Sequence, residues 1–170
     1  MNCTTEDLGI GHELAPVRHA ITRESIANYS RYVFGGRDTK NIHTDDEAAR
    51  RAGLPRAVAQ GRYPIGYMSE YALAFFGAGW VQGGCIDVSL TKPICPGDFI
   101  TVRGIVSDCQ RAVGGTRITL DVCLENQHGE RVTVGSASGW MHAELQPALN
   151  TPALPSNAAS RLDETHPQLD

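Results

Sequence analysis

The sequence lacks a long hydrophobic run, an excess of basic residues and a secretion-like start. Its longest apolar stretch, residues 71–81, is well short of the about 18 residues that cross a bilayer. The 170-residue chain carries 15 Lys and Arg against 19 Asp and Glu, a net charge of −4, which argues against a nucleic-acid-binding protein. An export signal begins with basic residues followed by an apolar core, whereas this N-terminus carries Glu6, Asp7 and Glu13. We therefore expect a cytoplasmic protein with no membrane span and no nucleic-acid partner.

Paired cysteines and metal-binding histidine motifs are also missing. The five cysteines are an odd, scattered set with no C-x-x-C pair, which argues against a disulfide framework and a structural zinc site. The histidines show no H-E-x-x-H or i, i+4 arrangement. No dinucleotide-binding or phosphate-binding glycine motif occurs either. We expect free thiols, no metal site and no cofactor.

The chain is long enough for one domain, at roughly 150 residues per domain. We expect a single domain over residues 1–145. From about Gln146 onward the sequence turns to Pro, Ala, Asn and Ser and loses its apolar period. Residues 146–170 are therefore predicted to form a disordered tail.

Two short helices are predicted in the first third of the chain. Thr22 is a suitable N-cap for a helix whose apolar residues recur at i, i+3 and i+7 from Ile26. Residues 44–47 read Thr-Asp-Asp-Glu, a capping box in which the Thr44 hydroxyl caps a second helix that ends at Gly53.

A longer third helix is predicted from Arg62 to Phe76, with Pro64 tolerated in its first turn. Its apolar spacing indicates one buried face, made of Ile65, Met68, Ala72 and Phe75.

After Gly79 the apolar pattern changes to period two, which predicts four strands near residues 86–90, 100–102, 118–124 and 132–134. Turn residues at 93–98, 113–116 and 126–129 separate them, and the last group is a hairpin signal. Residues 13–20 supply a further strand. The fold class is α+β: an antiparallel sheet of about five strands packed against the long helix.

A polar loop between the first two helices, residues 32–45, is the most unusual segment. It places Asp38 five residues before His43, so that a carboxylate and an imidazole can converge on one water molecule as a general acid/base pair. Alternatively, Asp38 supports the loop by binding backbone amides and His43 caps the second helix. The spacing alone does not decide between these interpretations.

Gly61 stands directly before the third helix, after Gln60. Free backbone amides at a helix start can hold a carbonyl oxygen that gains negative charge. The alternative is that Gly61 only makes the turn into the helix.

Residues 36–45, which read G-R-D-T-K-N-I-H-T-D, resemble the motif G-D-x-N-P-[IL]-H of the MaoC-like family of (R)-specific enoyl-thioester hydratases and dehydratases. Residues 53–61, G-L-P-R-A-V-A-Q-G, are similar to the family segment G-[LF]-x-x-x-[IV]-[AV]-[HQ]-G. Residues 92–98 and 126–129 resemble two family turns. The resemblance covers roughly residues 14–143.

The resemblance implies the hot-dog fold, in which a curved antiparallel sheet wraps around a long central helix, here residues 62–76, usually in a homodimer. It also implies that Asp38 and His43 are catalytic and that the Gly61 amide holds the thioester carbonyl. The implied substrate is an acyl thioester of coenzyme A or of an acyl-carrier protein.

Three positions depart from the family motif: Arg37 replaces Gly, Lys40 replaces Asn and Asn41 replaces Pro. Without the proline, Asn41 is expected to loosen the loop. The two cations either stabilise the Asp38 carboxylate and weaken it as a base, or face outward and attract an anionic substrate group. The expected substrate-binding residues are Arg37, Lys40, Asn41, Gln60 and Tyr67.

The resulting hypothesis is a hydro-lyase that adds or removes water across the α,β double bond of an acyl thioester. Two other readings stay open. One is a non-catalytic hot-dog subunit of a hetero-oligomeric dehydratase, and the other is a different thioester reaction, such as hydrolysis or isomerisation.

Overall fold

A computed structural model describes residues 8–142 of the chain. The predicted tail, residues 146–170, and the outermost residues of the predicted domain lie outside this range. Within it the elements follow the order β1 (Val17–Ala20), α1 (Arg23–Val33), α2 (Asp46–Arg51), α3 (Arg62–Phe76), α4 (Ala78–Gly83), β2 (Cys85–Leu90), β3 (Phe99–Ala112), β4 (Gly115–Asn126) and β5 (Arg131–His142).

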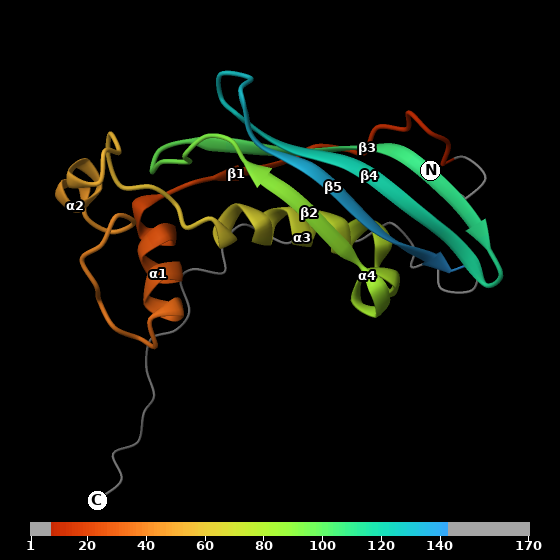
Figure 1. Cartoon of the computed structure of the whole chain (residues 1–170), viewed down its shortest axis with the longest axis horizontal. Helices are drawn as coiled ribbons and strands as arrows, with labels where there is room; N and C mark the ends of the chain where they lie inside the picture. The colour runs from red at the N-terminus through yellow and green to blue at the C-terminus, as the bar shows by residue number, and fades with distance from the viewer. Residues whose placement is uncertain (1–7, 143–170) are drawn as a thin grey trace, which may run out of the picture.

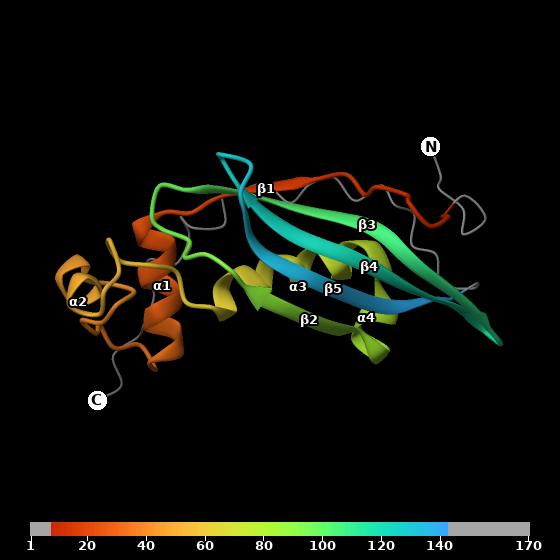
Figure 2. The same cartoon turned by 45° about the horizontal axis from the view of Figure 1, so that its top comes forward.

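The five strands form one sheet in the order β1-β3-β4-β5-β2, and every neighbouring pair is antiparallel. The sheet curves over α3, while α1 and α2 lie beyond one end of it (Figure 1). Figure 2 shows the same arrangement, with α3 and α4 under one face of the sheet. The predicted α+β class, with a curved antiparallel sheet around a long helix, is confirmed.

The strands β3 and β4 are longer than the alternating pattern predicts and form a hairpin that closes at Val113 and Gly114. Gly114 has a φ of 91°, a left-handed conformation that glycine adopts without strain. Val113 is fully exposed at the tip. In both views this tip lies at the opposite end of the molecule from α1 and α2.

Helix α3 has the predicted bounds, but its buried face is turned by about one residue from the predicted one. Met68 and Ala72 are buried as expected, whereas Ile65 and Phe75 are only half-buried. The remaining buried residues of the helix are Pro64, Tyr71 and Phe76.

Two glycines in the sheet explain this rotation. A Cβ at Gly104 would lie 2.9 Å from the Tyr71 ring, and a Cβ at Gly139 would lie 2.7 Å from the Phe76 ring. Both distances are below van der Waals contact, so the missing side chains leave the space that the two aromatic rings fill.

The prediction of three helices before the strands was wrong, because a fourth helix, α4, occupies residues 78–83. Gly79 lies inside α4, where the sequence suggested the start of strand periodicity. A Cβ at Gly79 would overlap the backbone of Trp140, so a glycine allows this helix to touch β5.

Helix α1 begins at the predicted cap: the Thr22 hydroxyl accepts a hydrogen bond from the Ser25 N–H at 3.0 Å. Helix α2 does not. Its N-cap is Asp45, whose carboxylate accepts from the Ala48 N–H at 2.7 Å, so the predicted capping box from Thr44 was wrong. The Thr44 hydroxyl instead donates to the Thr39 carbonyl within the preceding loop.

Candidate active site

The loop between α1 and α2 is fixed by Asn41. Its side-chain oxygen accepts from the His43 N–H at 2.8 Å, and its side-chain nitrogen donates to the Thr39 hydroxyl at 2.8 Å. Its carbonyl also accepts from the Asp45 N–H at 2.9 Å. The expectation that Asn41 loosens the loop was therefore wrong, because an Asx-type turn supplies the order that the family's proline would give. These bonds also occupy the Asn41 side chain that was expected to bind substrate.

The His43 imidazole is held in one orientation. Its Nδ1 lies 2.8 Å from the carbonyl oxygen of Val58. A carbonyl can only accept a hydrogen bond, so Nδ1 carries the proton in the neutral ring and Nε2 keeps a free lone pair. The half-buried His43 therefore presents a nitrogen that can accept a proton. His43 does not cap α2.

Asp38 points to a different partner. Its carboxylate Oδ1 accepts from Arg31 Nε at 3.0 Å, and the side chain is 85% exposed. The expected contacts with loop amides are not formed within the described structure, and the cation that contacts Asp38 is Arg31 of α1. Arg37 and Lys40 are both exposed on the same loop. An ion pair as exposed as this one contributes about 0–1 kcal/mol, so it gives way at little cost.

Two further backbone contacts join residues 57–61 to the loop and to the start of α2. The Asp46 carboxylate accepts from the Ala57 N–H at 2.9 Å and pairs with Arg23 at 2.9 Å. The Ile42 carbonyl accepts from the Val58 N–H at 3.1 Å. The Ala57 N–H, followed by Arg23, holds the pKa of Asp46 below its usual value. The segment that carries the His43 partner therefore leads directly to Gly61.

Gly61 is the N-cap of α3, and no side chain caps this helix within the described part of the chain. It lines a pocket of about 270 Å³ between the start of α3 and the end of β2. A Cβ on Gly61 would lie 2.7 Å from Leu90 Cδ1, so glycine keeps this mouth open. Most of the other walls are apolar; the full lining is Val58, Ala59, Gly61, Pro64, Leu90, Thr91, Lys92, Pro93, Ile94 and Thr133.

Gln60 and Tyr67, which were also expected to bind substrate, do not line this pocket. Gln60 is only 8% exposed, and both polar atoms of its side chain are buried without a hydrogen-bond partner among the described residues. Tyr67 donates to the Tyr63 hydroxyl at 2.9 Å and stacks on His19 at a ring distance of 3.9 Å. Tyr67 is thus part of an aromatic cluster between α3 and β1.

The structure thus brings His43 and Gly61 to one region through Val58, whereas Asp38 turns toward α1. Gly61 is the one predicted site residue that lines the pocket, and the residues that sequence reasoning missed include Val58, Lys92 and Thr133. The alternating pattern could not reveal Thr133, because Val132 and Val134 set the apolar period of this strand, whereas in the structure Thr133 itself is buried.

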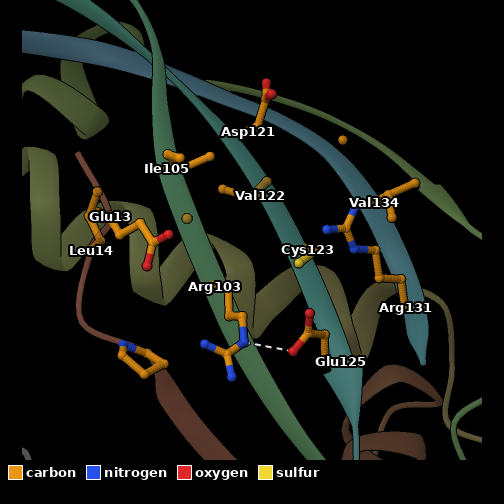
Figure 3. A pocket seen from close by; sticks show the side chains of 13 residues that line it. Glu13, Leu14, Arg103, Ile105, Asp121, Val122, Cys123, Glu125, Arg131 and Val134 are labelled. Atoms are coloured by element: carbon orange, nitrogen blue, oxygen red, sulfur yellow. Dashed lines mark hydrogen bonds and ion pairs between the residues drawn. The ribbon is translucent and has the colours of Figure 1, made fainter. Parts of the chain in front are cut away.

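A larger hollow than the pocket at Gly61 lies elsewhere, on the face of the sheet turned away from α3 (Figure 3). It has a volume of about 640 Å³, and an ion pair between Arg103 Nε and Glu125 Oε2, 2.6 Å apart, crosses its floor. None of the expected site residues lines it. Of the three expected catalytic residues, Gly61 lines the smaller pocket, whereas Asp38 and His43 line neither; His43 is joined to that pocket through its contact with Val58.

Among the described residues, no group of three or more His, Cys, Asp or Glu side chains is placed to hold a metal ion. Cys85, Cys95, Cys109 and Cys123 are free thiols. No helix within residues 8–142 has the length and apolar character needed to span a bilayer.

Comparison with protein families identifies residues 9–125 as a MaoC like domain. The chain belongs to the MaoC-like family. The match includes the loop with Asp38 and His43, the Gly61 segment and most of the sheet. Among proteins with curated descriptions, none matches this chain.

Solved structures of MaoC-like proteins share the fold. The MaoC-like dehydratase from Rhodospirillum rubrum is 24% identical over 81% of this chain and 95% of its own, with a TM-score of 0.64. The R-hydratase PhaJ1 from Pseudomonas aeruginosa is 22% identical over 86% of this chain and 95% of its own, with a TM-score of 0.62. A chain of the ChsH1-ChsH2 complex from Mycobacterium tuberculosis is 18% identical over 79% of this chain and 98% of its own, with a TM-score of 0.63. These similarities establish the hot-dog fold.

Proposed function

We propose that this MaoC-like protein is a hydro-lyase that adds water to, or removes it from, the α,β double bond of an acyl thioester. The observation that carries the proposal is the orientation of His43. Its Nδ1 is tied to the Val58 carbonyl, which leaves Nε2 free to act as a base. Val58 lies three residues before Gly61, at the start of α3, which has no side-chain cap. Proton transfer and carbonyl polarisation are the two tasks that this reaction requires.

In the hydration direction, one proton leaves a water molecule as its oxygen bonds to the β-carbon, and the α-carbon gains a proton. The His43 Nε2 and the Asp38 carboxylate share these transfers. The electron pair of the double bond moves toward the thioester carbonyl while the new C–O bond forms. The Gly61 N–H stabilises the negative charge that develops on that oxygen. In dehydration the same groups act in reverse.

Asp38 must exchange its contact with Arg31 for the reacting water. The loop permits this exchange because the Asp38 side chain is 85% exposed and its ion pair is a surface one. Arg37 and Lys40 lie on the same exposed loop and supply the charge for phosphates of coenzyme A or a carrier-protein arm.

The test is the ultraviolet absorbance of crotonyl-coenzyme A with the purified wild-type protein, Asp38→Asn and His43→Gln. Each variant should lose at least about 100-fold in turnover, the lower end of general acid/base contributions. Asp121→Asn and His128→Gln, which change the same residue types outside the loop and outside the lining of the pocket at Gly61, serve as matched controls and should keep full activity. Near-normal turnover in both loop variants would contradict the assignment.

A second candidate is a non-catalytic subunit of a hetero-oligomeric dehydratase. The pairing of Asp38 with Arg31 favours it, since among the described residues the carboxylate bonds to Arg31 and forms no hydrogen bond with His43. Such a subunit would be inactive alone and would gain activity only with a partner chain. Arg31→Gln distinguishes the two candidates, because releasing Asp38 should leave a hydro-lyase at least as active and an inactive subunit unchanged.

We also propose that the chain forms a homodimer. Strand β2 lies at an edge of the sheet and pairs only with β5 in the described structure, so its outer backbone groups are open to a second copy. Sedimentation equilibrium should give twice the chain mass, and a monomer would contradict this.

A further inference from the structure

Thr133 is a buried polar residue of the pocket at Gly61 that the loop motif does not include. It lies on β5 between Leu90 of β2 and Leu124 of β4, on the side of the sheet that faces α3. The residue is only 1% exposed, and its Oγ1 is buried without a hydrogen-bond partner among the described residues. A hydroxyl left in this way destabilises a fold, because its hydrogen bonds to water are lost and not replaced.

The other polar side chains of the pocket are already paired. Thr91 Oγ1 donates to the Arg131 carbonyl at 2.9 Å. Lys92 Nζ lies 2.6 Å from a carboxylate oxygen of Glu130. Thr133 is therefore the lining side chain whose hydrogen-bonding capacity is unused, in a pocket that is otherwise mainly apolar.

A second unused donor lines the same pocket. Gly61 precedes α3, a helix of 15 residues with no side-chain cap, and the Gly61 N–H has no backbone hydrogen-bond partner among the described residues, so it is free to bind a ligand. The two features come from different elements, one from the helix start and one from the inner face of the sheet. A ligand atom that accepts two hydrogen bonds would satisfy both.

We propose that the Thr133 hydroxyl is a second hydrogen-bond donor, beside the Gly61 N–H, to the carbonyl oxygen of an acyl thioester. The inference rests on the proposed hydro-lyase function and adds a residue to its site. A carbonyl oxygen has two lone pairs, and two donors stabilise the charge that develops on it better than one. A valine would fill the same space with no unpaired hydroxyl, so the ligand explains the threonine.

The test compares Thr133→Val, which keeps the shape, with Thr133→Ser, which keeps the hydroxyl. On crotonyl-coenzyme A, whose acyl group has no polar atom besides the carbonyl, Thr133→Val should lower kcat by at least about tenfold and change KM less. Thr133→Ser should stay within about threefold of the wild type. Equal kcat values for Thr133→Val and the wild type would overturn the inference.

Thermal unfolding distinguishes a ligand-binding role of the Thr133 hydroxyl from a structural role, because the two predict opposite changes in the Tm of Thr133→Val. Removing an unpaired buried hydroxyl should raise the Tm of Thr133→Val by roughly 2–4 °C. A lower Tm than the wild type would show that the hydroxyl has a partner within the protein, and would overturn the inference.

Calorimetry with butyryl-coenzyme A, a saturated thioester, separates this inference from the hydro-lyase proposal. Suppose that the wild type binds butyryl-coenzyme A but turns over no enoyl thioester. Weaker binding by Thr133→Val then supports the two-donor site, while the hydro-lyase proposal is rejected. If Thr133→Val binds as the wild type does, only the Thr133 inference fails. If the wild type neither turns over nor binds a thioester, both fail.

Discussion

Substitution of Gly61 by alanine tests the pocket without removing any hydrogen-bonding group. Gly61 has φ −57° and ψ −32°, a conformation that alanine adopts without strain. The added Cβ would lie 2.7 Å from Leu90 Cδ1, whereas carbon atoms in contact lie about 3.5–4.0 Å apart. The two groups must therefore separate by roughly 1 Å.

The cost of this separation to stability is small. Leu90 is already 49% exposed and flexible, so displacing it loses at most about 1 kcal/mol of apolar burial. Alanine in place of glycine in helical backbone returns up to about 1 kcal/mol. We expect Gly61→Ala to change Tm by no more than about 2–4 °C.

The effect on the reaction should be large, because the new methyl group and the displaced Leu90 side chain both enter the pocket mouth. A misplacement of about 1 Å in a site can cost roughly 100-fold in rate. We expect a loss of this order in crotonyl-coenzyme A hydration, measured beside thermal unfolding. The double variant Gly61→Ala with Leu90→Ala should recover part of it, with Leu90→Ala alone as control. Full activity in Gly61→Ala would refute the assignment of this pocket.

Two further predictions concern stability. Gly139→Ala should lower the free energy of unfolding, measured by urea titration, by about 1–3 kcal/mol, because its Cβ would lie 2.7 Å from the buried Phe76 ring. Combining it with Phe76→Leu should restore part of the loss. An unchanged urea midpoint for Gly139→Ala would contradict this packing. The pKa of Asp46 is lower in the folded protein than in the unfolded chain, so the unfolded chain binds this proton more readily. The ionised Asp46 carboxylate therefore adds to the free energy of unfolding above its ordinary pKa of 3.8, and this stabilisation disappears as the pH falls through the folded pKa. Asp46→Asn should therefore lose less stability than the wild type below about pH 4, and parallel acid profiles would contradict this.

The long helix and the approximate positions of the strands along the chain could be read from the sequence because their signals are local and repeated. The bounds of α3 follow from a continuous apolar pattern between Gly61 and Gly77. Its buried face could not be read in the same way. The positions of Tyr71 and Phe76 depend on spaces left by glycines on distant strands, which the helix sequence does not contain.

The loop shows the same limit at the candidate site. The spacing of Asp38 and His43 pointed to an acid/base pair, and this assignment stays a prediction. The sequence could not show that Arg31 pairs with the carboxylate, since this depends on how the loop returns to α1. It also could not show that Asn41 orders the loop through hydrogen bonds, because the family comparison indicated only the loss of a proline.

The long β3–β4 hairpin offers a practical handle on this protein. Its tip at Val113 and Gly114 projects into solvent at the end of the molecule away from α1 and α2. Exposed loop tips tolerate insertions well. A fluorophore, an affinity peptide or a surface linker attached there would leave the loop and the pocket at Gly61 accessible, so that thioester binding could be followed on immobilised protein.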